Sequence, residues 1–572
     1  MRKKLYSTLT VALCSAALLA GTVFQSPTAL AKTDPNVSLI AQMNAAVKKK
    51  SWNSAATYAK KIAANYDNQK NYDLAAKYYD LTAAYWEKYG KPSWGITSTI
   101  RGDHIRTVVQ TYAEVPVSSP ARKLEKFEPV TGSYIGLYPA GKSFSGDPAG
   151  AEAAFGQKYA LYLTYTYFNK YYPGNTAFPV DYAKKVKALG GALQIGWEPH
   201  AGLDEVQDDE YIHQFAREAA ESGIPIFLRY ACEMNGEWVA WNGDPKKYIE
   251  KWRLVHDIMA KEAPNVAMVW SPNFLPRDNI DPYYPGDDYV DWVGFSLYTI
   301  PYSHGQLKLG GNPIDYLRPL YEKYSKKPIM VSEGAVSFHS YQLGKDYTDW
   351  GVGELANMYA YMPRIYPQLK SITYFDLDKR TTSYDNQNNN YDLHDSPKML
   401  AAYQKFTSSP FFLTKVEDHA MPDNPVTYKK ISETTELNGI VNLFTYVKLP
   451  LGAQPYAVHL YNGDKLLLKR AYAPPFDMQV DFDRLPDSGK LIVKVLDSKF
   501  QVLVTKEFPY KKGPKQAASA TGTATGTAAA KAAASPLTGI VRSISYAGLL
   551  ATSDSPIIGH VKSLWDLDGT KN

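Results

Sequence analysis

Two stretches of this chain decide its fold: PIFLRYACEMNGEWVAW at residues 225–241 and KPIMVSEGAVS at residues 327–337. Each opens with a short apolar run, which is typical of a parallel strand buried on both faces. Each run is followed by a glutamate, Glu233 in the first stretch and Glu333 in the second. We therefore predict two parallel strands that each carry a carboxylate at the carboxyl end.

These strands belong to a series of apolar runs between residues 125 and 410, several of them separated by amphipathic stretches. The predicted strands are residues 133–139, 158–168, 191–199, 225–233, 266–272, 289–298, 327–333 and 371–378. Eight such units over about 280 residues predict a (β/α)8 TIM barrel. Glu233 and Glu333 then end the fourth and seventh strands, on the face of the barrel where active sites form.

The regions on either side of the barrel have different patterns, as expected for a multidomain chain of 572 residues. Residues 32–115 repeat small and aromatic residues at helical spacing, which predicts an α-helical, tetratricopeptide-like domain acting as a helical cap or a protein-docking module. Residues 415–511 alternate at period two and predict an immunoglobulin-like β-sandwich, used as a spacer or for carbohydrate binding. Residues 512–535 predict a flexible linker, and residues 536–572 form a tail to which no role is assigned.

The N-terminal segment, residues 1–31, has a basic start, an apolar stretch and an Ala-Leu-Ala ending. This pattern predicts a cleaved secretory signal, and hence a secreted or cell-envelope protein. No later segment has the roughly 20 unbroken apolar residues of a membrane helix. Removal of the segment lowers the net charge from +6 to +3, and no arginine-rich patch indicates a nucleic-acid partner. Because Cys14 lies in the signal, Cys232 is left alone and cannot form an intrachain disulfide.

A pair of carboxylates at one barrel mouth is the arrangement that glycoside hydrolysis requires. Retaining glycosidases use a protonated carboxyl as acid/base and an ionised carboxylate as nucleophile. The fourth and seventh strands can converge on one pocket, so Glu233 and Glu333 are the candidates. Glu237 and Glu198 are alternative acids, the first in a loop beyond the predicted strand and the second at the end of the third strand.

No cofactor and no metal site are predicted, because no group of His, Asp and Glu residues shows the spacing of metal ligands. The polar stretch 385–395 lacks the regular spacing of a calcium loop, so we interpret it as a loop at the top of the barrel. Asp376 and Asp378 on the eighth strand are either sugar-binding residues or acceptors for loop amides.

Four motifs, RYACEMNGEWVAW, VAMVWSPN, YYPGDDYVDWVGFSLY and KPIMVSEG, resemble glycoside hydrolase family 26 in sequence and in order. The resemblance covers residues 130–400 and implies a polysaccharide substrate. Members of this family are mostly endo-acting β-1,4-mannanases, and some cut mixed-linkage β-glucan or β-1,3-xylan. The resemblance also places the chain in the clan of barrels whose catalytic glutamates lie on strands four and seven.

The resemblance implies that Glu233 is the acid/base, that Glu333 is the nucleophile, and that Tyr298 hydrogen-bonds the nucleophile. The substrate-binding residues that it implies, or that lie beside its motifs, are Trp197, His200, Arg229, Asn235, Trp238, Trp241 and Tyr298. Strand alternation puts Arg229 on the inward face, where its charge lowers a carboxylate pKa. Cys232 stands where many members have a histidine, so contacts near the sugar 2-hydroxyl are expected to differ.

Two further functions remain open. One is a non-catalytic polysaccharide-binding or envelope protein built on a former hydrolase barrel. The other is a protein-interaction module led by residues 32–115. Both of these functions would involve contact with a protein or the cell wall, through residues 32–115 or 415–511.

Overall fold

A computed structural model describes residues 34–513 of the chain, apart from 118, 121, 169–176, 304, 382–388 and 433. The predicted signal, nearly all of the predicted linker and the tail lie outside these residues. The chain divides into two compact units between Ile105 and Arg106. Within the described part of the chain, no helix is both long enough and apolar enough to cross a bilayer.

The first unit is helical, with elements α2 (Val37–Lys48), α3 (Trp52–Asn68), α4 (Tyr72–Lys88), η1 (Pro92–Gly95) and α5 (Ile96–Ile105). Buried alanines such as Ala59 and Ala75 let the helices approach closely. The predicted helical range of 32–115 is too long, because Val108–Pro116 forms a strand, β1. Its sequence, VVQTYAEVP, is rich in β-branched residues, which favour strands over helices.

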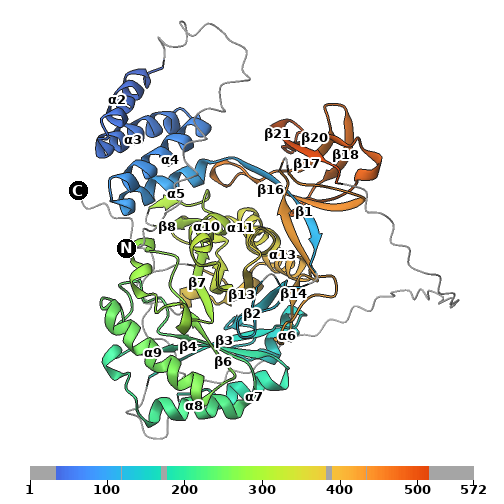
Figure 1. Ribbon diagram of the computed structural model, residues 1–572. Helices are drawn as coiled ribbons and strands as arrows, with labels where there is room; N and C mark the ends of the chain where they lie inside the picture. The colour runs from blue at the N-terminus through green and yellow to red at the C-terminus, as the bar shows by residue number, and fades with distance from the viewer. Residues whose placement is uncertain are drawn as a thin grey trace, which may run out of the picture. The chain divides into compact units, whose positions relative to one another are not determined.

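The second unit contains a closed barrel of eight parallel strands, since β13 pairs with β2. The strands in order are β2 (Ser133–Pro139), β3 (Leu161–Tyr167), β4 (Ala192–Glu198), β5 (Ile226–Tyr230), β6 (Val266–Trp270), β7 (Trp292–Thr299), β10 (Ile329–Val336) and β13 (Leu369–Asp376). Figure 1 shows the strands at the centre of this part of the molecule. The predicted TIM barrel is confirmed, and its fourth and seventh strands are β5 and β10.

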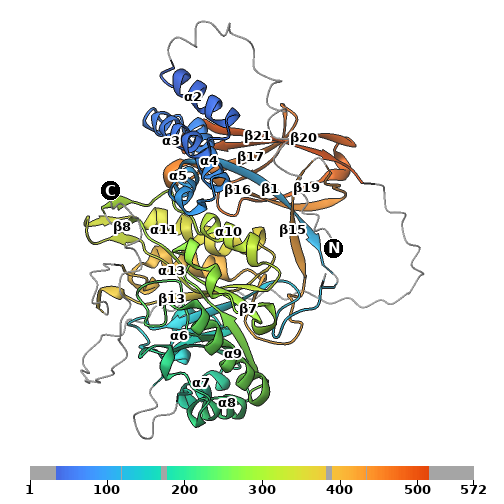
Figure 2. The same ribbon diagram turned by 60° about the vertical axis from the view of Figure 1, so that its left-hand side comes forward.

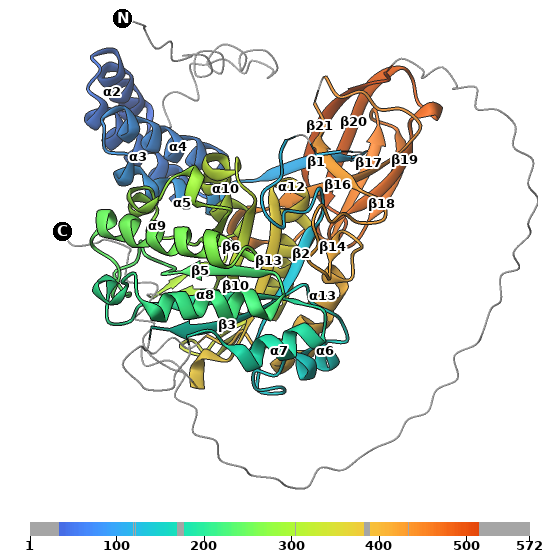
Figure 3. The same ribbon diagram turned by 60° about the horizontal axis from the view of Figure 1, so that its bottom comes forward.

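Helices and short turns connect the strands and cover the barrel from outside; Figure 3 shows α7, α8 and α9 alongside the strands β3 to β6. The helices are α6 (Pro148–Phe155), α7 (Val180–Ala188), α8 (Glu210–Ser222), α9 (Pro245–Glu262), α10 (Pro313–Tyr324), α11 (Thr348–Leu355), η6 (Ala356–Tyr361), α12 (Met362–Ile365) and α13 (Pro397–Thr407). The turns are η2 (Leu203–Glu205), η3 (Arg277–Asn279), η4 (Asp281–Tyr283), η5 (Asp287–Tyr289), η7 (Lys379–Thr381) and η8 (Leu393–Asp395). The short strands are β8 (Tyr302–Ser303), β9 (Gln306–Leu307), β11 (His339–Ser340), β12 (Lys345–Asp346) and β14 (Phe412–Leu413).

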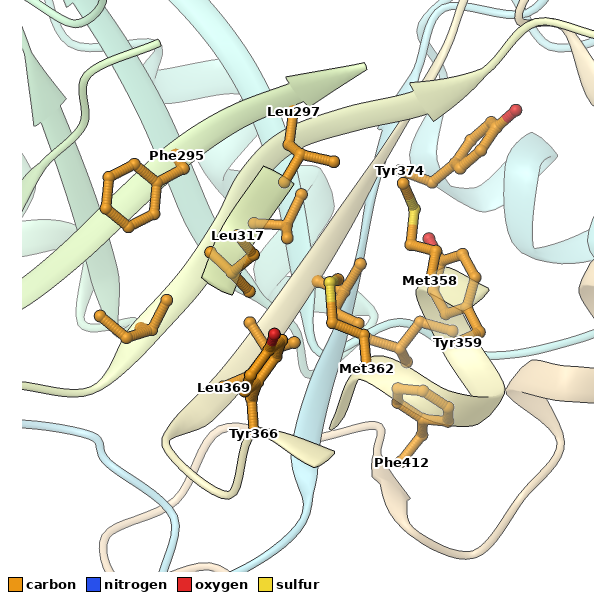
Figure 4. Close-up of a cluster of buried hydrophobic side chains, with 14 of the residues drawn as sticks. Phe295, Leu297, Leu317, Met358, Tyr359, Met362, Tyr366, Leu369, Tyr374 and Phe412 are labelled. Carbon is orange, nitrogen blue, oxygen red and sulfur yellow. The ribbon is translucent and has the colours of Figure 1, made fainter. Parts of the chain in front are cut away.

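The apolar core lies between the strands and this outer layer. Phe295 and Leu297 of β7 belong to a buried cluster with Leu317 of α10 and Met358 of η6 (Figure 4). Side chains alternate between the two faces of a strand. The residues of β7 between and beyond this pair therefore face the barrel interior, and these include Tyr298.

The barrel interior is polar below its mouth. Gln194 of β4 accepts a hydrogen bond from the Thr373 hydroxyl of β13 at 2.8 Å. Ser271 and Ser332 hydrogen-bond each other at 2.7 Å, and Arg229 of β5 donates to Ser271 at 3.2 Å. These buried groups are fully excluded from solvent, so their mutual hydrogen bonds fix the strand ends that carry the site.

The chain beyond the barrel, together with β1, forms two antiparallel four-stranded sheets. One contains β15 (Val426–Lys430), β1, β16 (Ile440–Lys448) and β19 (Asp477–Asp481), with the turns η9 (Pro450–Gly452) and η10 (Phe482–Arg484) nearby in sequence. The other contains β18 (Leu466–Ala471), β17 (Ala457–Asn462), β20 (Ser488–Leu496) and β21 (Val502–Lys511). Figure 2 shows β1, which precedes the barrel in sequence, among these later strands. The immunoglobulin-like classification of this region stays a prediction.

Candidate active site

Glu333 reaches the barrel interior through an irregularity in β10. The register between β10 and β7 shifts between Val331 and Glu333, so that Val331 pairs with Phe295 and Glu333 pairs with Ser296. Ser332 is the extra residue of this bulge. A bulge of this kind re-aims the side chain that follows it, and bulges are frequent beside active sites.

Four donors hold the Glu333 carboxylate. Its Oε1 accepts a hydrogen bond from the Tyr298 hydroxyl, and its Oε2 accepts one from the Tyr165 hydroxyl of β3. Both terminal nitrogens of Arg229 also lie 3.2 Å from Oε2. Burial by itself raises the pKa of Glu333. The charges of Arg229 and Lys379, together with the two tyrosine hydroxyls, outweigh burial and hold the pKa below its usual value. Glu333 is therefore an ionised carboxylate.

Glu233 lies just beyond β5, which ends at Tyr230 and not at Glu233 as the sequence predicted. The turn that carries it has positive φ angles at Ala231 (44°) and Glu233 (58°). Each such non-glycine residue costs roughly 1–2 kcal/mol, and strain of this kind gathers at functional sites. The turn, and not strand alternation, therefore aims the Glu233 side chain.

The Glu233 carboxyl accepts hydrogen bonds from two neutral donors, Trp238 Nε1 at 2.8 Å and Asn273 Nδ2 at 3.0 Å. Burial, followed by the negative charge of Glu333, raises its pKa, and these donors with Ser296 only partly offset the rise. The same serine also accepts a hydrogen bond from Arg229 at 3.3 Å. One network therefore joins the two carboxyl groups.

The two glutamates thus have opposite pKa shifts, upward for Glu233 and downward for Glu333. Both are nearly buried, with 8% and 7% of their surface exposed. A pair of carboxyl groups whose environments separate their pKa values can serve as proton donor and anion at the same pH. The geometry therefore supports two different chemical roles at one site.

The segment that follows Glu233 holds the Glu233 turn and the Asn273 loop in place. Gly236 lets the Trp238 ring fold back onto the turn, because a Cβ at Gly236 would overlap that ring. Asn235 is fully buried and ties down the Asn273 loop, accepting from the Asn273 amide at 2.8 Å and donating to its carbonyl oxygen at 3.0 Å. Asn235 is thus bonded within the protein, where the sequence predicted contact with a sugar.

A second cluster lies beside Glu233. His200 Nε2 is 3.1 Å from a carboxylate oxygen of Glu198, and this contact raises the pKa of His200. Trp241 is only 2% exposed, and its Nε1 donates to the Cys232 carbonyl oxygen at 2.7 Å. The Cys232 thiol points toward Glu198, 3.5 Å away, and burial raises its pKa well above the usual value. Cys232 is therefore a neutral thiol.

The prediction that Trp197 faces the sugar is wrong. Trp197 is fully buried and stacks between Phe168 and Phe215 of α8, with ring centroids 4.4 Å and 4.0 Å away. On β4, Gly196 lies on the inner face, where a Cβ would come within 2.6 Å of the Tyr165 ring. Alternation then turns Trp197 outward, into the layer between strand and helix.

The remaining sequence candidates lie as follows. Glu237 is exposed to solvent and Arg229 is fully buried behind Glu333. Asp378 forms ion pairs with Lys142 at 2.6 Å and with Arg380 at 2.8 Å. Asp378 also accepts a hydrogen bond from the Arg380 amide at 3.1 Å, which is the loop-amide role that the sequence offered as one of two alternatives.

Three further residues of the site, Tyr165, Asn273 and Lys379, were not among the candidates predicted from the sequence. Tyr165 belongs to the strand sequence YLTYTY, in which no side chain stands out as facing the barrel interior. Asn273 stands directly after a predicted strand, and that position is the signal that would have identified it. Lys379 is 6% exposed, and its Nζ lies 5.3 Å from the Tyr298 ring centroid and 5.1 Å from that of Phe375.

Residues 205–306 match the sequence profile described as Glycosyl hydrolase family 26. This part of the barrel is similar in sequence to family 26. The matched segment includes Glu233 and Tyr298 but ends before Glu333. This finding confirms the resemblance drawn from the motifs, and the class of enzyme that it indicates is a glycosidase.

Parts of the chain are similar in sequence to curated proteins. It is 26% identical over 245 residues to "Endoglucanase H" of Acetivibrio thermocellus, covering 39% of this chain and 25% of that protein. It is 30% identical over 116 residues to "Beta-1,3-xylanase TXYA" of a Vibrio species, covering 19% and 25%. It is 32% identical over 108 residues to "Mannan endo-1,4-beta-mannosidase A and B" of Caldalkalibacillus mannanilyticus, covering 17% and 18%. The chain thus spans a quarter or less of the length of these relatives.

Proposed function

We propose that this chain is a retaining glycoside hydrolase in which Glu233 is the acid/base and Glu333 is the nucleophile. The observation that carries the proposal is the opposite pKa shift of two carboxyl groups joined by one hydrogen-bond network. A raised pKa keeps a proton on Glu233 for the leaving group. A lowered pKa keeps Glu333 ionised for attack on a sugar carbon.

In the first step, Glu333 attacks the anomeric carbon and the bond to the leaving oxygen breaks as Glu233 transfers its proton to that oxygen. A glycosyl ester of Glu333 results. In the second step, Glu233 removes a proton from water, and the water oxygen displaces Glu333 from the anomeric carbon. Arg229, Tyr165 and Tyr298 hold the nucleophile in position during both steps.

The proposed substrate is a β-linked polysaccharide, with β-1,4-mannan as the first candidate and β-glucan or β-xylan as alternatives. The names of the relatives support this class, since they include an endoglucanase, a β-1,3-xylanase and a mannan endo-1,4-β-mannosidase. We also propose that the protein is exported, on the basis of residues 1–31. A polymer too large to enter a cell is cleaved outside it.

The test is the release of reducing ends from mannan, mixed-linkage glucan and β-1,3-xylan. Glu333→Gln keeps the shape of the side chain and removes the nucleophile. Glu237→Gln makes the same change at an exposed glutamate of the same barrel mouth and is the matched control. We expect Glu333→Gln to lose activity by at least about 10³-fold while Glu237→Gln keeps it. Equal activity of the two variants would refute the assignment of Glu333.

A further inference from the structure

A group of potential metal ligands lies at the barrel mouth, outside the carboxylate pair. Asp376 ends β13, while Asp392 and His394 belong to the segment leading into α13. One ligand atom from each of the three residues lies within 4.8 Å of those from the other two. The fold therefore brings together residues that are 16 and 18 positions apart in sequence, which is why their spacing predicted no metal site.

Asp376 lies on the outer face of β13, away from the barrel interior. The Thr373 hydroxyl of β13 points inward, to Gln194. Its neighbour Tyr374 points outward, where its ring centroid lies 5.4 Å from that of Tyr403 in α13. Strand alternation puts Asp376 on the same outward side as Tyr374. The group is thus separate from Glu233 and Glu333.

Asp376 has an oxygen that no group of the described chain satisfies. The residue is fully buried, and its Oδ1 accepts a hydrogen bond from the Leu393 amide at 2.9 Å. Its Oδ2 is buried without any hydrogen-bond partner. Gly141 faces this oxygen, and a Cβ at that position would collide with it. The oxygen packs against the Gly141 backbone, and a buried carboxylate oxygen without a hydrogen-bond partner calls for a ligand.

His394 places a buried ring nitrogen in the same group. Its Nε2 lies 3.4 Å from the Ala154 carbonyl oxygen, and a carbonyl can only accept, so Nε2 carries the proton. The Nδ1 atom is buried without a hydrogen bond and lies 3.8 Å from Oδ1 of Asp392. Metal-binding histidines commonly donate their second nitrogen to a backbone carbonyl in this way.

Asp392 completes the group with a carboxylate that is already oriented. Its Oδ1 accepts from the His394 amide at 3.0 Å and its Oδ2 from the Lys142 amide at 3.0 Å. Asp376 and Asp392 are both buried, so two like-charged carboxylates are removed from water close to each other. A cation placed between the two carboxylates would relieve both the desolvation and the repulsion.

We propose that Asp376, Asp392 and His394 bind one divalent transition-metal cation, Zn²⁺ or Mn²⁺. The imidazole nitrogen favours these ions over Ca²⁺ and Mg²⁺, which prefer oxygen ligands throughout. The ion would tie the end of β13 to the segment before α13. Its role is structural, and it takes no part in the proposed hydrolysis.

The test is calorimetric titration of the full chain, freed of metal by a chelator, with ZnCl₂ and separately with MnCl₂. His394→Ala removes one proposed ligand. His213→Ala is the matched control, because His213 is a surface histidine held between Asp208 and Glu262 at 2.9 Å and 2.7 Å. We expect one ion per chain in the wild type and in His213→Ala, with an affinity at least about tenfold lower in His394→Ala.

A second variant, Asp376→Asn, keeps the side-chain shape and should also lose at least about tenfold in affinity. In the wild type and in His213→Ala the metal should raise the thermal midpoint, and in the two ligand variants it should not. Anomalous diffraction at the zinc edge needs no variant and should place the ion between the three residues. Absence of binding by the wild type, unchanged affinity in both ligand variants, or an ion at another position would overturn the proposal.

Discussion

Replacement of Tyr165 by Phe removes one hydrogen bond from Glu333 and leaves the aromatic ring in place. A hydrogen bond to a charged group contributes about 1.5–3 kcal/mol. The lower end applies to Tyr165, because Arg229 also donates to Oε2 and keeps that oxygen satisfied. A loss of about 1.5 kcal/mol from the ionised form raises the pKa of Glu333. It also corresponds to a fall of about tenfold in kcat/KM if the contact strengthens in the transition state.

Tyr298→Phe should have the larger effect. Among the described residues, Tyr298 alone donates to Oε1 of Glu333, so its loss leaves a buried carboxylate oxygen without a partner. The upper end of the range, about 3 kcal/mol, then applies. This predicts a larger rise in the pKa of Glu333 and a fall of about 100-fold in kcat/KM.

The assay is the pH dependence of kcat/KM, whose acidic limb reports the pKa of Glu333 in the free enzyme. Tyr138→Phe is the matched control, since Tyr138 stands beside Tyr165, with ring centroids 5.3 Å apart, and belongs to the same mouth. The acidic limb should move up in Tyr165→Phe, further in Tyr298→Phe, and stay in place in Tyr138→Phe. An unchanged limb in both of the first two variants would refute the reasoning that these hydroxyls keep Glu333 ionised.

Three further predictions concern burial. Trp197→Ala should lower the free energy of unfolding in urea by roughly 3–5 kcal/mol and leave KM unchanged, because the ring fills the layer between β4 and α8; a raised KM with unchanged stability would contradict this placement. Cys232→Ala should lower kcat/KM by less than about tenfold, since the neutral thiol is a weak donor; inactivation of the wild type by iodoacetamide at neutral pH would contradict a buried, protonated thiol. Burial raises the pKa of Glu354 to about 8 from 4.5. The folded state therefore holds a proton that the unfolded state has lost, and stability should fall as the pH rises from 4.5 to about 8. Glu354→Gln removes this penalty and should gain roughly 3 kcal/mol over the wild type at pH 7, measured by urea unfolding at pH 5 and pH 7; an equal difference at the two pH values would contradict it.

The barrel could be predicted from the sequence because its strands are continuous apolar runs at regular intervals. Because the runs are continuously apolar, the sequence does not show which side chains point into the barrel and which point outward. In a strand buried on both faces, the inner and the outer residues are equally apolar, so nothing in ALQIGWE shows that Trp197 points outward. The position of Gly196 against Tyr165 decides the orientation, and that contact exists only in three dimensions.

The catalytic candidates show a second limit. Glu233 and Glu333 could be found because each follows an apolar run. The local backbone features that orient their side chains could not be predicted. One is a bulge at Ser332, and the other is a turn with positive φ at two residues that are not glycine. Both depend on pairing with other strands and loops. The strand β1 shows the same limit, since its partners lie beyond the barrel.

The most direct test of the central claim is to trap the covalent intermediate. The wild-type chain is incubated with 2-deoxy-2-fluoroglycosyl fluorides of mannobiose, cellobiose and xylobiose, and its peptides are analysed by mass spectrometry. The account predicts a single glycosyl adduct on the peptide that contains Glu333, formed with at least one of these reagents. An adduct on a different carboxylate, or a hydrolysis product with inverted anomeric configuration, would contradict it.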